Sequence, residues 1–243
     1  MNGNIYQNII QKTGKKIAAL IDPDKTNDLA ISKTILLAEK AKVDFFLIGG
    51  SLVSENPDYF IQKLKKDSNI PIVLFPGSLL QYSSVADAIL FLSLISGRNP
   101  ELLIGNHVAV APLLKKSNME VLPTGYMLID SGKQTSVEYI SNTFPIPANK
   151  VDIAVATAVA GELLGLKLIY LEAGSGAESP VPSEMIKQVK QNIDIPLIIG
   201  GGLKNESQVE NACKSGADII VVGNALEKEY DKILKMAEIV HGF

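Results

Sequence analysis

Eight short apolar runs recur along the chain and constrain its fold more than any other feature. They cover residues 16–22, 43–50, 70–77, 87–94, 124–130, 166–172, 195–202 and 218–224. Most are continuously apolar, which is typical of parallel strands covered on both faces. Segments with helical spacing, such as residues 30–42 and 183–192, separate several of the runs. The pattern predicts an α/β fold, a TIM (β/α)8 barrel that forms one domain over residues 1–243.

Residues 95–123 fit this pattern least well. They mix turn signals with two apolar pieces and do not give one clear helix. A doubly wound open sheet therefore remains an alternative fold. Elsewhere the signals for helix ends agree with a barrel, because Gly216 stands where a helix is expected to end before the last strand.

Charge and composition exclude several classes of function. The chain has 23 Lys and Arg against 26 Asp and Glu, so its net charge of -3 gives no field that attracts nucleic acid or an anionic membrane. It contains neither a signal-peptide pattern nor an apolar stretch long enough for a transmembrane segment. The single cysteine, Cys213, predicts a packing role in a reducing, cytoplasmic location.

The residues at the strand ends identify the candidate site, because the carboxyl ends of barrel strands form the active site of a TIM barrel. Polar side chains and glycines follow most of the apolar runs. They are Asp22, Gly49, Gly50, Ser51, Pro76, Gly77, Ser78, Tyr170, Glu172, Gly200, Gly201, Gly202, Gly223 and Asn224. We expect all of them to meet at one mouth of the barrel.

Glycines after the seventh and eighth runs indicate a phosphate site. Barrels commonly hold phosphate there with backbone N–H groups, and glycine lets the backbone approach an anion closely. The segments "IIGGG" and "VVGN" supply four such glycines. Ordinary turns at the strand ends are the alternative interpretation.

The sixth run, "LKLIYLE", carries a carboxylate at its tip. Strand side chains alternate, so Tyr170 and Glu172 should point into the barrel together with Leu166 and Leu168. Glu172 there can accept a proton or bind a substrate hydroxyl. A salt bridge to a neighbouring strand is the alternative role.

"DPDK", residues 22–25, places two carboxylates at the end of the first run. With the Ser51 hydroxyl on the adjacent strand, Asp22 offers oxygen ligands that suit Mg2+ once a diphosphate and water complete the shell. Asp-Pro-Asp also forms ordinary turns. The sequence lacks paired cysteines, H-E-x-x-H, a nucleophile elbow, a Walker A loop, a D-D-x-x-D segment and a lysine clearly placed inside a strand.

With these motifs in order, the whole chain resembles the geranylgeranylglyceryl phosphate synthase family, which includes bacterial heptaprenylglyceryl phosphate synthases. The matching segments are "LIDPDK", "IGGS", "SGRNPELLIG", "ATAVAGELLG", "YLEAGSGA", "IIGGGL" and "VVGNALE". The resemblance implies a TIM-barrel prenyltransferase that uses Mg2+. It would move a prenyl group from its diphosphate to the 3-hydroxyl of sn-glycerol 1-phosphate and release diphosphate. "SGRNPELLIG" favours geranylgeranyl diphosphate over the heptaprenyl substrate.

The resemblance also assigns roles to residues. It implies that Asp22 and Ser51 bind the metal and that Glu172 and Tyr170 act on the glycerol hydroxyl. The glycerol 1-phosphate would contact Tyr170, Leu171, Glu172, Ala173, Gly174, Ser175, Gly176, Gly201, Gly202, Gly223 and Asn224.

The second substrate and the assembly are less defined. Residues 74–83 and 102–114 are candidates for an apolar prenyl groove, and Arg98 and Lys25 for a diphosphate contact. The resemblance further implies a homo-oligomer, a dimer or a hexamer of dimers, in which an exposed aromatic such as Tyr139 takes part.

Two other functions remain open from the residues alone. A phosphosugar isomerase or aldolase barrel would share the phosphate site but needs an acid/base pair or a Schiff-base lysine. A non-catalytic binder of a phosphate ligand would need the glycines but not Glu172.

Overall fold

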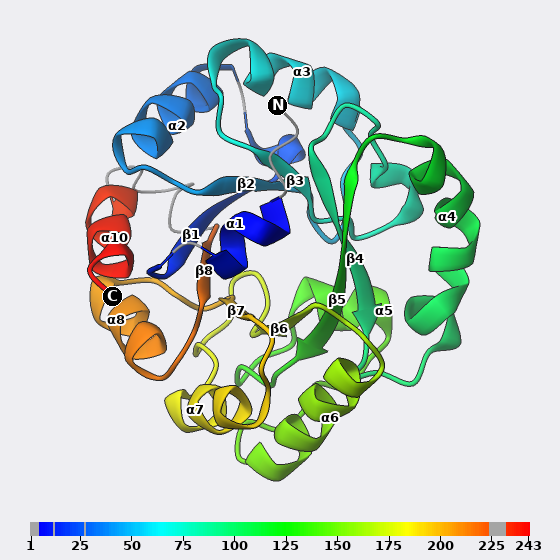
Figure 1. Ribbon diagram of the computed structural model, residues 1–243, viewed down its shortest axis with the longest axis vertical. Coiled ribbons are helices and arrows are strands. Elements are labelled where there is room, and N and C mark those ends of the chain that lie inside the picture. The colour runs from blue at the N-terminus through cyan, green and yellow to red at the C-terminus, as the bar shows by residue number, and fades with distance from the viewer. Residues whose placement is uncertain (1–4, 12, 27, 224–231) are drawn as a thin grey trace.

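The computed structural model describes residues 5–11, 13–26, 28–223 and 232–243, and it forms a closed barrel. Eight parallel strands follow one another in chain order, and the eighth returns to pair with the first, Lys16 opposite Ile219. Figure 1 shows α2, α3, α4, α6, α7, α8 and α10 as a ring around the strands, with α1 over the centre of the barrel. The TIM-barrel prediction is confirmed, and the open-sheet alternative is wrong because both edges of the sheet are paired.

The strands fall on the eight predicted runs but are mostly shorter. Their bounds are β1 Lys16–Ile21, β2 Phe45–Ile48, β3 Ile72–Leu74, β4 Ala88–Leu94, β5 Glu120–Leu128, β6 Leu168–Glu172, β7 Leu197–Gly200 and β8 Ile219–Val222. Several predicted glycines and prolines therefore lie just beyond the strands, in the loops that form the mouth.

Helices connect successive strands. The α-helices are α1 Ile5–Gln11, α2 Asp28–Lys40, α3 Pro57–Asp67, α4 Asn106–Lys116, α5 Ser136–Ser141, α6 Val151–Leu163, α7 Ser183–Asn192, α8 Glu206–Lys214 and α10 Lys232–His241, and short turns are η1 Pro23–Lys25, η2 Leu79–Gln81 and η3 Glu101–Gly105. Gly216, at φ +108°, follows the end of α8 as predicted. Within the described residues, none of these helices has the length and apolar character needed to cross a bilayer.

Strand side chains alternate between two cores. In β6, Leu168 and Tyr170 belong to the barrel interior, whereas Ile169 and Leu171 belong to the shell between barrel and helices. This confirms the alternation predicted for the sixth run. Leu166 is the exception, because β6 begins only at Leu168, and its side chain meets α6 at Gly161 on the same side as Ile169.

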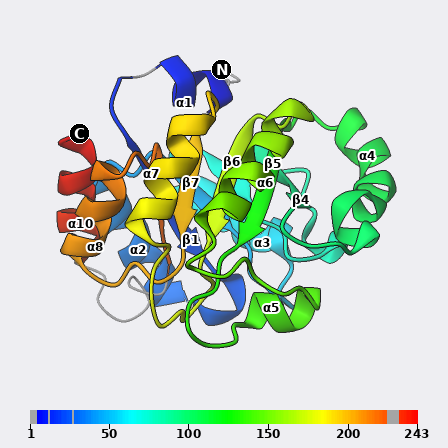
Figure 2. The same cartoon turned by 90° about the horizontal axis from the view of Figure 1, so that it is seen from below.

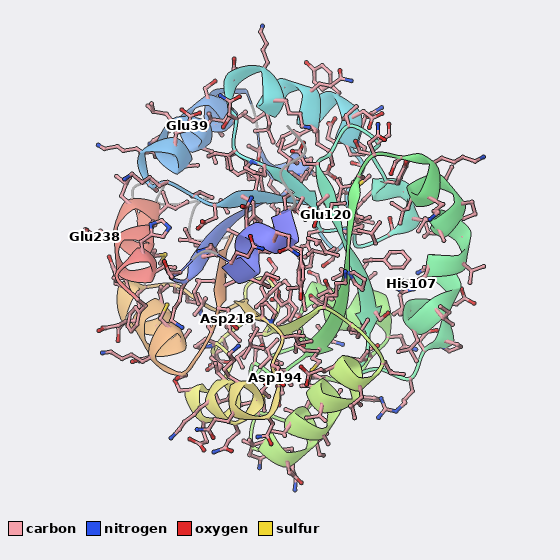
Figure 3. The ribbon with its side chains drawn as sticks, in the orientation of Figure 1. Glu39, His107, Glu120, Asp194, Asp218 and Glu238 are labelled. Carbon is pink, nitrogen blue, oxygen red and sulfur yellow. The ribbon has the colours of Figure 1, made fainter. Side chains whose placement is uncertain are left out.

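The two ends of the barrel are closed differently. Helix α1 lies across one end, and Figure 2 shows it on the opposite side of the barrel from α5. The Glu120 carboxylate at the start of β5 accepts hydrogen bonds from the backbone N–H groups of Ile5 and Tyr6, and Figure 3 labels it beside α1. With α1 covering this end, the carboxyl ends of the strands form the mouth, as a TIM barrel requires.

Residues 95–123 contain more regular structure than the sequence indicated. A π-helical turn, η3, leads directly into α4, which continues through Pro112. Strand β5 begins at Glu120, four residues before the predicted run, and includes Pro123. Proline lacks one ladder donor, but the Pro123 carbonyl still accepts from the Lys167 N–H at 2.9 Å.

Candidate functional site

A polar cavity of about 590 Å³ lies at the carboxyl ends of the strands. Loops after β1, β2, β5, β6, β7 and β8 all contribute to its wall. Its predicted lining residues are Asp22, Lys25, Gly49, Gly50, Ser51, Tyr170, Glu172, Gly174, Ser175, Gly176, Gly201, Gly202 and Gly223. The structure therefore brings together residues from both ends of the chain, as the strand-end argument predicted.

Glu172, the last residue of β6, is the buried carboxylate of this cavity. Its Oε1 accepts a hydrogen bond from the Gly174 N–H at 2.6 Å, because the chain turns back at Gly174 with φ +95°. Burial raises the pKa of Glu172 to about 7, although the Gly174 hydrogen bond and the nearby Tyr170 hydroxyl favour the charged form. No ion pair joins Glu172 to a described residue. A carboxylate with this pKa can accept a proton near neutral pH.

Three aromatic rings stand beside Glu172. Tyr170 stacks on Phe75 with ring centres 5.4 Å apart, and Tyr126 packs edge-on to Tyr170 at 5.2 Å. Burial, and then the charge of Glu172, raise the pKa of Tyr170 and Tyr126 well above the usual value. The Tyr170 hydroxyl approaches Glu172 but makes no hydrogen bond of standard geometry with a described residue. Both tyrosines therefore stay neutral donors at the base of the cavity.

The glycines after β7 allow the backbone to lie against Glu172. A Cβ atom at Gly201 would lie 2.3 Å from Glu172 Oε1, and one at Gly202 would lie 2.7 Å from the Ser179 carbonyl oxygen. Both residues also have positive φ, +77° and +70°. A side chain at either position would collide with the carboxylate or its loop, so these glycines are required by geometry and leave backbone N–H groups close to the cavity.

The two carboxylates of "DPDK" have different surroundings. Asp22 lines the cavity, and its Oδ2 lies 2.9 Å from Lys25 Nζ. Asp24 instead accepts hydrogen bonds from the Glu55 N–H at 2.9 Å and the Ser54 N–H at 2.8 Å, which lower its pKa. The turn interpretation of this segment is also correct, because Asp22 caps η1 by accepting from the Asp24 N–H. Of the two carboxylates, Asp22 is the one that faces the site.

Leu171, Ala173 and Arg98 are predicted residues that do not line the cavity. Leu171 and Ala173 are buried in the outer shell, so only their main chains face the site region. Asn224 lies outside the described residues. Arg98, a candidate cation, hydrogen-bonds the carbonyl of Gly97 at 2.6 Å and lines neither the polar cavity nor the groove described next.

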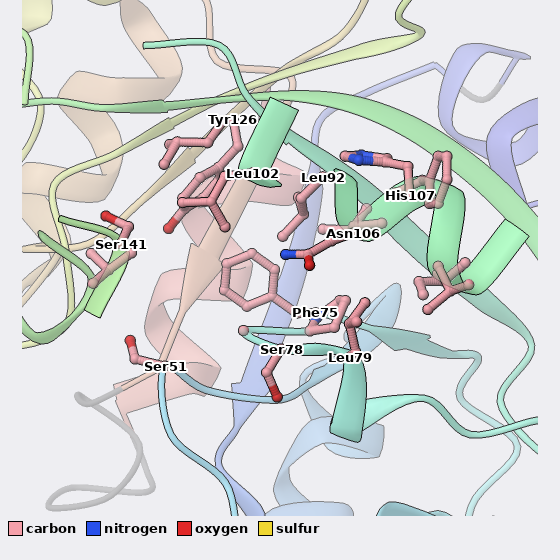
Figure 4. Close-up of a pocket in the computed structure, with 18 of the residues that line it drawn as sticks. Ser51, Phe75, Ser78, Leu79, Leu92, Leu102, Asn106, His107, Tyr126 and Ser141 are labelled. Carbon is pink, nitrogen blue, oxygen red and sulfur yellow. The ribbon is translucent and has the colours of Figure 1, made fainter. Parts of the chain in front are cut away.

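An apolar groove of about 180 Å³ opens beside the polar cavity and is shown in Figure 4. Residues 75–79 and 82 form one wall, and Leu102, Asn106, His107 and Val110 form another, so both predicted groove segments contribute. The two hollows share six lining residues, Gly50, Ser51, Phe75, Tyr126, Val137 and Ile140. They form one continuous site with a polar and an apolar part.

His107 is the histidine among the described lining residues of the groove. It is buried, its Nε2 lies 3.2 Å from Ser93 Oγ, and its ring packs edge-on to Phe91. Burial lowers the pKa of His107, which keeps the imidazole neutral at neutral pH. The groove wall therefore carries no full charge at this position.

Several lining residues were not identified from the sequence. Tyr126 has a recoverable signal, because it stands two residues before the end of β5 on the inward face and pairs in register with Tyr170. Thr135 and the α5 residues that follow it gave no such signal in the sequence, since no strand-end argument places a short helix over the mouth. Lys204, just after the β7 glycines, also lines the cavity.

The aldolase alternative needs a lysine at the mouth. Among the described strands, lysine occurs once, as Lys16 at the first position of β1. It is buried at the end of the barrel opposite the cavity, where its Nζ donates to the Gly14 carbonyl at 2.8 Å. The strands therefore supply no Schiff-base lysine to the site.

Comparison with known proteins gives consistent matches over nearly the full chain. The model of the PcrB family matches residues 9–241. Geranylgeranylglyceryl phosphate synthases from Chitinophaga pinensis and Pyrococcus horikoshii are 52% and 42% identical, covering 99% and 93% of this chain and 97% and 90% of theirs. The crystal structure of (S)-3-O-geranylgeranylglyceryl phosphate synthase from Thermoplasma acidophilum with sn-glycerol-1-phosphate is 30% identical. It covers 99% of this chain and 100% of its own, with a TM-score of 0.94.

Proposed function

This chain belongs to the PcrB family, and on that premise we propose that it is a prenyltransferase that makes geranylgeranylglyceryl phosphate. It transfers the geranylgeranyl group of geranylgeranyl diphosphate to the 3-hydroxyl of sn-glycerol 1-phosphate. The observation that carries the proposal is the buried carboxylate of Glu172, with a pKa of about 7, in a polar cavity that opens into an apolar groove. A polar acceptor and an apolar donor need these two compartments side by side.

Glycerol 1-phosphate fits the polar compartment. The backbone at Gly201, Gly202 and Gly223 offers N–H groups for the phosphate, and Lys204 adds a positive charge at the same wall. This places the glycerol hydroxyls towards Glu172 and Tyr170, on the floor of the cavity. Gly174 and Gly176 keep the β6 loop open above them.

The reaction requires a proton acceptor at the hydroxyl and stabilisation at the prenyl carbon. The bond between C1 and the diphosphate oxygen breaks, and the diphosphate leaves with the electron pair. The glycerol oxygen bonds to C1, and its proton passes to Glu172. Phe75 and Tyr126 line both compartments, so their rings border the place where C1 would gain positive charge.

Mg2+ is the cofactor that we propose for the diphosphate. Asp22 and Ser51 offer oxygen ligands at one wall of the cavity, where Lys25 Nζ lies 2.9 Å from Asp22 Oδ2. The described residues contain no cluster of three or more metal-binding side chains, so this donor set fits an ion that arrives with the diphosphate. Bound there, Mg2+ would neutralise charge on the leaving group.

A homo-oligomer is also part of the proposal. Large apolar side chains are exposed at the end of α6 and just after α5, with Leu163 at 82% and Phe144 at 95% exposure. Tyr139 of α5 is 75% exposed and also borders the polar cavity. A second copy of the chain would cover such residues. Analytical ultracentrifugation measures the assembly, and a monomer at micromolar concentration would contradict this part.

The buried thiol of Cys213, whose pKa burial raises to about 11, is consistent with a cytoplasmic enzyme that needs no disulfide.

One assay tests the reaction. Purified protein is incubated with Mg2+, labelled glycerol 1-phosphate and geranylgeranyl diphosphate, and the lipid phase is extracted for labelled product. Heptaprenyl diphosphate in a parallel reaction tests the longer-chain alternative. If no prenyl diphosphate from geranyl to heptaprenyl gives a labelled lipid, the proposed function is wrong.

A further inference from the structure

The buried amide of Gln81 lies behind two loops that line the polar cavity and the apolar groove. Gln81 ends the short turn η2 and is only 4% exposed. It lines neither hollow, so the proposed reaction gives it no contact with a substrate. Its hydrogen bonds nevertheless reach two loops that do line them.

The hydrogen bonds described for this side chain all go to those loops. Its Nε2 donates to the Gly50 carbonyl at 2.8 Å. Its Oε1 accepts from the Gly50 N–H at 3.3 Å and from the Gly77 N–H at 3.1 Å. The amide therefore bonds both backbone groups of Gly50 and ties them to the loop after β3.

These bonds begin where the sheet ends. The last pair between β2 and β3 is Ile48 with Leu74, followed by the Phe75 N–H donating to the Ile48 carbonyl at 2.8 Å. Beyond that point the strands separate into loops. Gln81 then bonds the N–H and C=O groups of Gly50, which no longer have a strand partner.

The loops are too close for other side chains to take over this role. A Cβ atom at Gly77 would lie 2.3 Å from the Gly50 carbonyl oxygen, and one at Gly49 would lie 2.0 Å from the Phe75 carbonyl oxygen. Backbone therefore meets backbone at this wall, and glycines without side chains cannot hold the contact. The amide of Gln81 supplies the hydrogen bonds that fix it.

The far side of Gly50 faces the proposed metal ligand. A Cβ atom on Gly50 would lie 3.1 Å from Asp22 Oδ2, so Gly50 stands between Gln81 and Asp22. Ser51 follows at once, and both Gly50 and Ser51 line the cavity and the groove. The position of Ser51 relative to Asp22 therefore depends on the bonds that Gln81 makes.

We propose that Gln81 is a positioning residue for the prenyl diphosphate: it holds Gly50 and Ser51 where the diphosphate in the cavity joins the tail in the groove. This inference rests on the proposed function. Glycerol 1-phosphate binds at the opposite wall, formed after β6, β7 and β8, and does not depend on Gln81. Loss of the amide should therefore weaken binding of the prenyl diphosphate and leave binding of glycerol 1-phosphate unchanged.

The Gln81→Met variant, similar in size but without the hydrogen bonds, tests this selectivity. We expect the KM for geranylgeranyl diphosphate to rise about tenfold, while the KM for glycerol 1-phosphate changes less than about twofold. Calorimetric titration with Mg2+ and inorganic pyrophosphate should show the same loss of affinity. Thr124→Val is the control, since Thr124 is also buried and bonds only its own strand, at the Leu122 carbonyl. It should lower stability without separating the two KM values.

A second variant, Gln81→Glu, tests the donated bond by itself. The carboxylate keeps an acceptor for the Gly50 and Gly77 N–H groups but turns an oxygen towards the Gly50 carbonyl. Protonation restores a donor, so kcat/KM for the variant relative to the wild type should rise as the pH falls. Using the ratio removes the titration of Glu172, which is common to both proteins.

Equal changes in both KM values for Gln81→Met, or a lower melting temperature with both KM values unchanged, would overturn the inference. Failure of the proposed function looks different. In that case the wild type makes no lipid product, while the pyrophosphate titration still shows whether Gln81 supports anion binding at this wall.

Discussion

The polar cavity and the apolar groove meet at six shared residues but are built in different ways. Strand tips and their glycines form the cavity, so its residues recur at predictable points in the chain. The groove is formed by the loop after β3, the side of β4, the π-helical turn η3, α4 and part of α5. Strand periodicity thus predicts the cavity well, whereas the groove depends on how helices pack beside the barrel.

The electrostatics of the two regions differ in the same way. In the cavity, burial raises the pKa of the Glu172 carboxylate to about 7, and a second carboxylate, Asp22, forms an ion pair with Lys25. In the groove, the one titratable side chain among its described lining residues besides tyrosine, His107, is kept neutral by burial. Charged side chains therefore line the cavity proposed for the reaction, and none is among the described lining residues of the groove proposed for the prenyl tail. Each prediction below perturbs one region and measures whether the other responds.

The largest effect is expected from Glu172→Gln. The amide keeps the size of the side chain but cannot accept the hydroxyl proton, so kcat should fall about 10³-fold. Steady-state kinetics measure this, and circular dichroism checks the fold. Glu184→Gln, at an exposed position of α7, is the matched control. If the rate stays within tenfold of the wild type, another residue must be the general base.

The same substitution should alter the pH dependence of stability. Burial raises the pKa of Glu172 from 4.5 to about 7, so the folded protein holds this proton more tightly than the unfolded chain. The stabilisation is complete below pH 4.5 and is lost as the pH rises through 7, an amount of about 3 kcal/mol. Denaturant unfolding at both ends of this range should show the wild type losing that much relative to Glu172→Gln. Parallel curves for the two proteins would mean that Glu172 has an ordinary pKa.

Asp22→Asn should affect the metal response more than the chemistry. Removing one carboxylate charge from the proposed ligand set should raise the Mg2+ concentration for half-maximal activity about tenfold. Asp24→Asn is the neighbouring control, because the Asp24 carboxylate is occupied by the N–H groups of Ser54 and Glu55. That control should lower stability and leave the Mg2+ response unchanged. Identical Mg2+ titrations for wild type and Asp22→Asn would contradict the assignment.

The smallest expected effect lies in the groove. Leu102→Trp replaces a leucine of the groove wall with a larger indole side chain. The preference for geranylgeranyl over geranyl diphosphate should therefore fall about fivefold in kcat/KM. Ile104→Trp, on the same turn but 60% exposed and outside both linings, should not change the preference. The KM for glycerol 1-phosphate should stay constant in both. A change there would show that the two compartments are coupled.

Sequence periodicity was sufficient to predict the barrel and the side chains at the floor of the cavity. Continuous apolar runs are what a strand buried on both faces requires, and strand alternation placed Tyr170 and Glu172 on the inward side. The glycines after β7 were predicted as a phosphate site, which stays a prediction; the structure shows that Gly201 and Gly202 exclude a Cβ atom because they lie against Glu172 and the loop after β6. These inferences need only local geometry and the rule that barrel strands end at one mouth.

Only the tertiary structure decided which residues from distant segments meet. It brought Tyr126 against Tyr170, joined the groove to the cavity at Phe75, and placed Gln81 behind Gly50. It also separated the two carboxylates of "DPDK", giving Asp22 to the cavity and Asp24 to a loop. A sequence specifies the type and spacing of its side chains. The partners of a buried amide or carboxylate are set by which loops the closed barrel brings within hydrogen-bond distance.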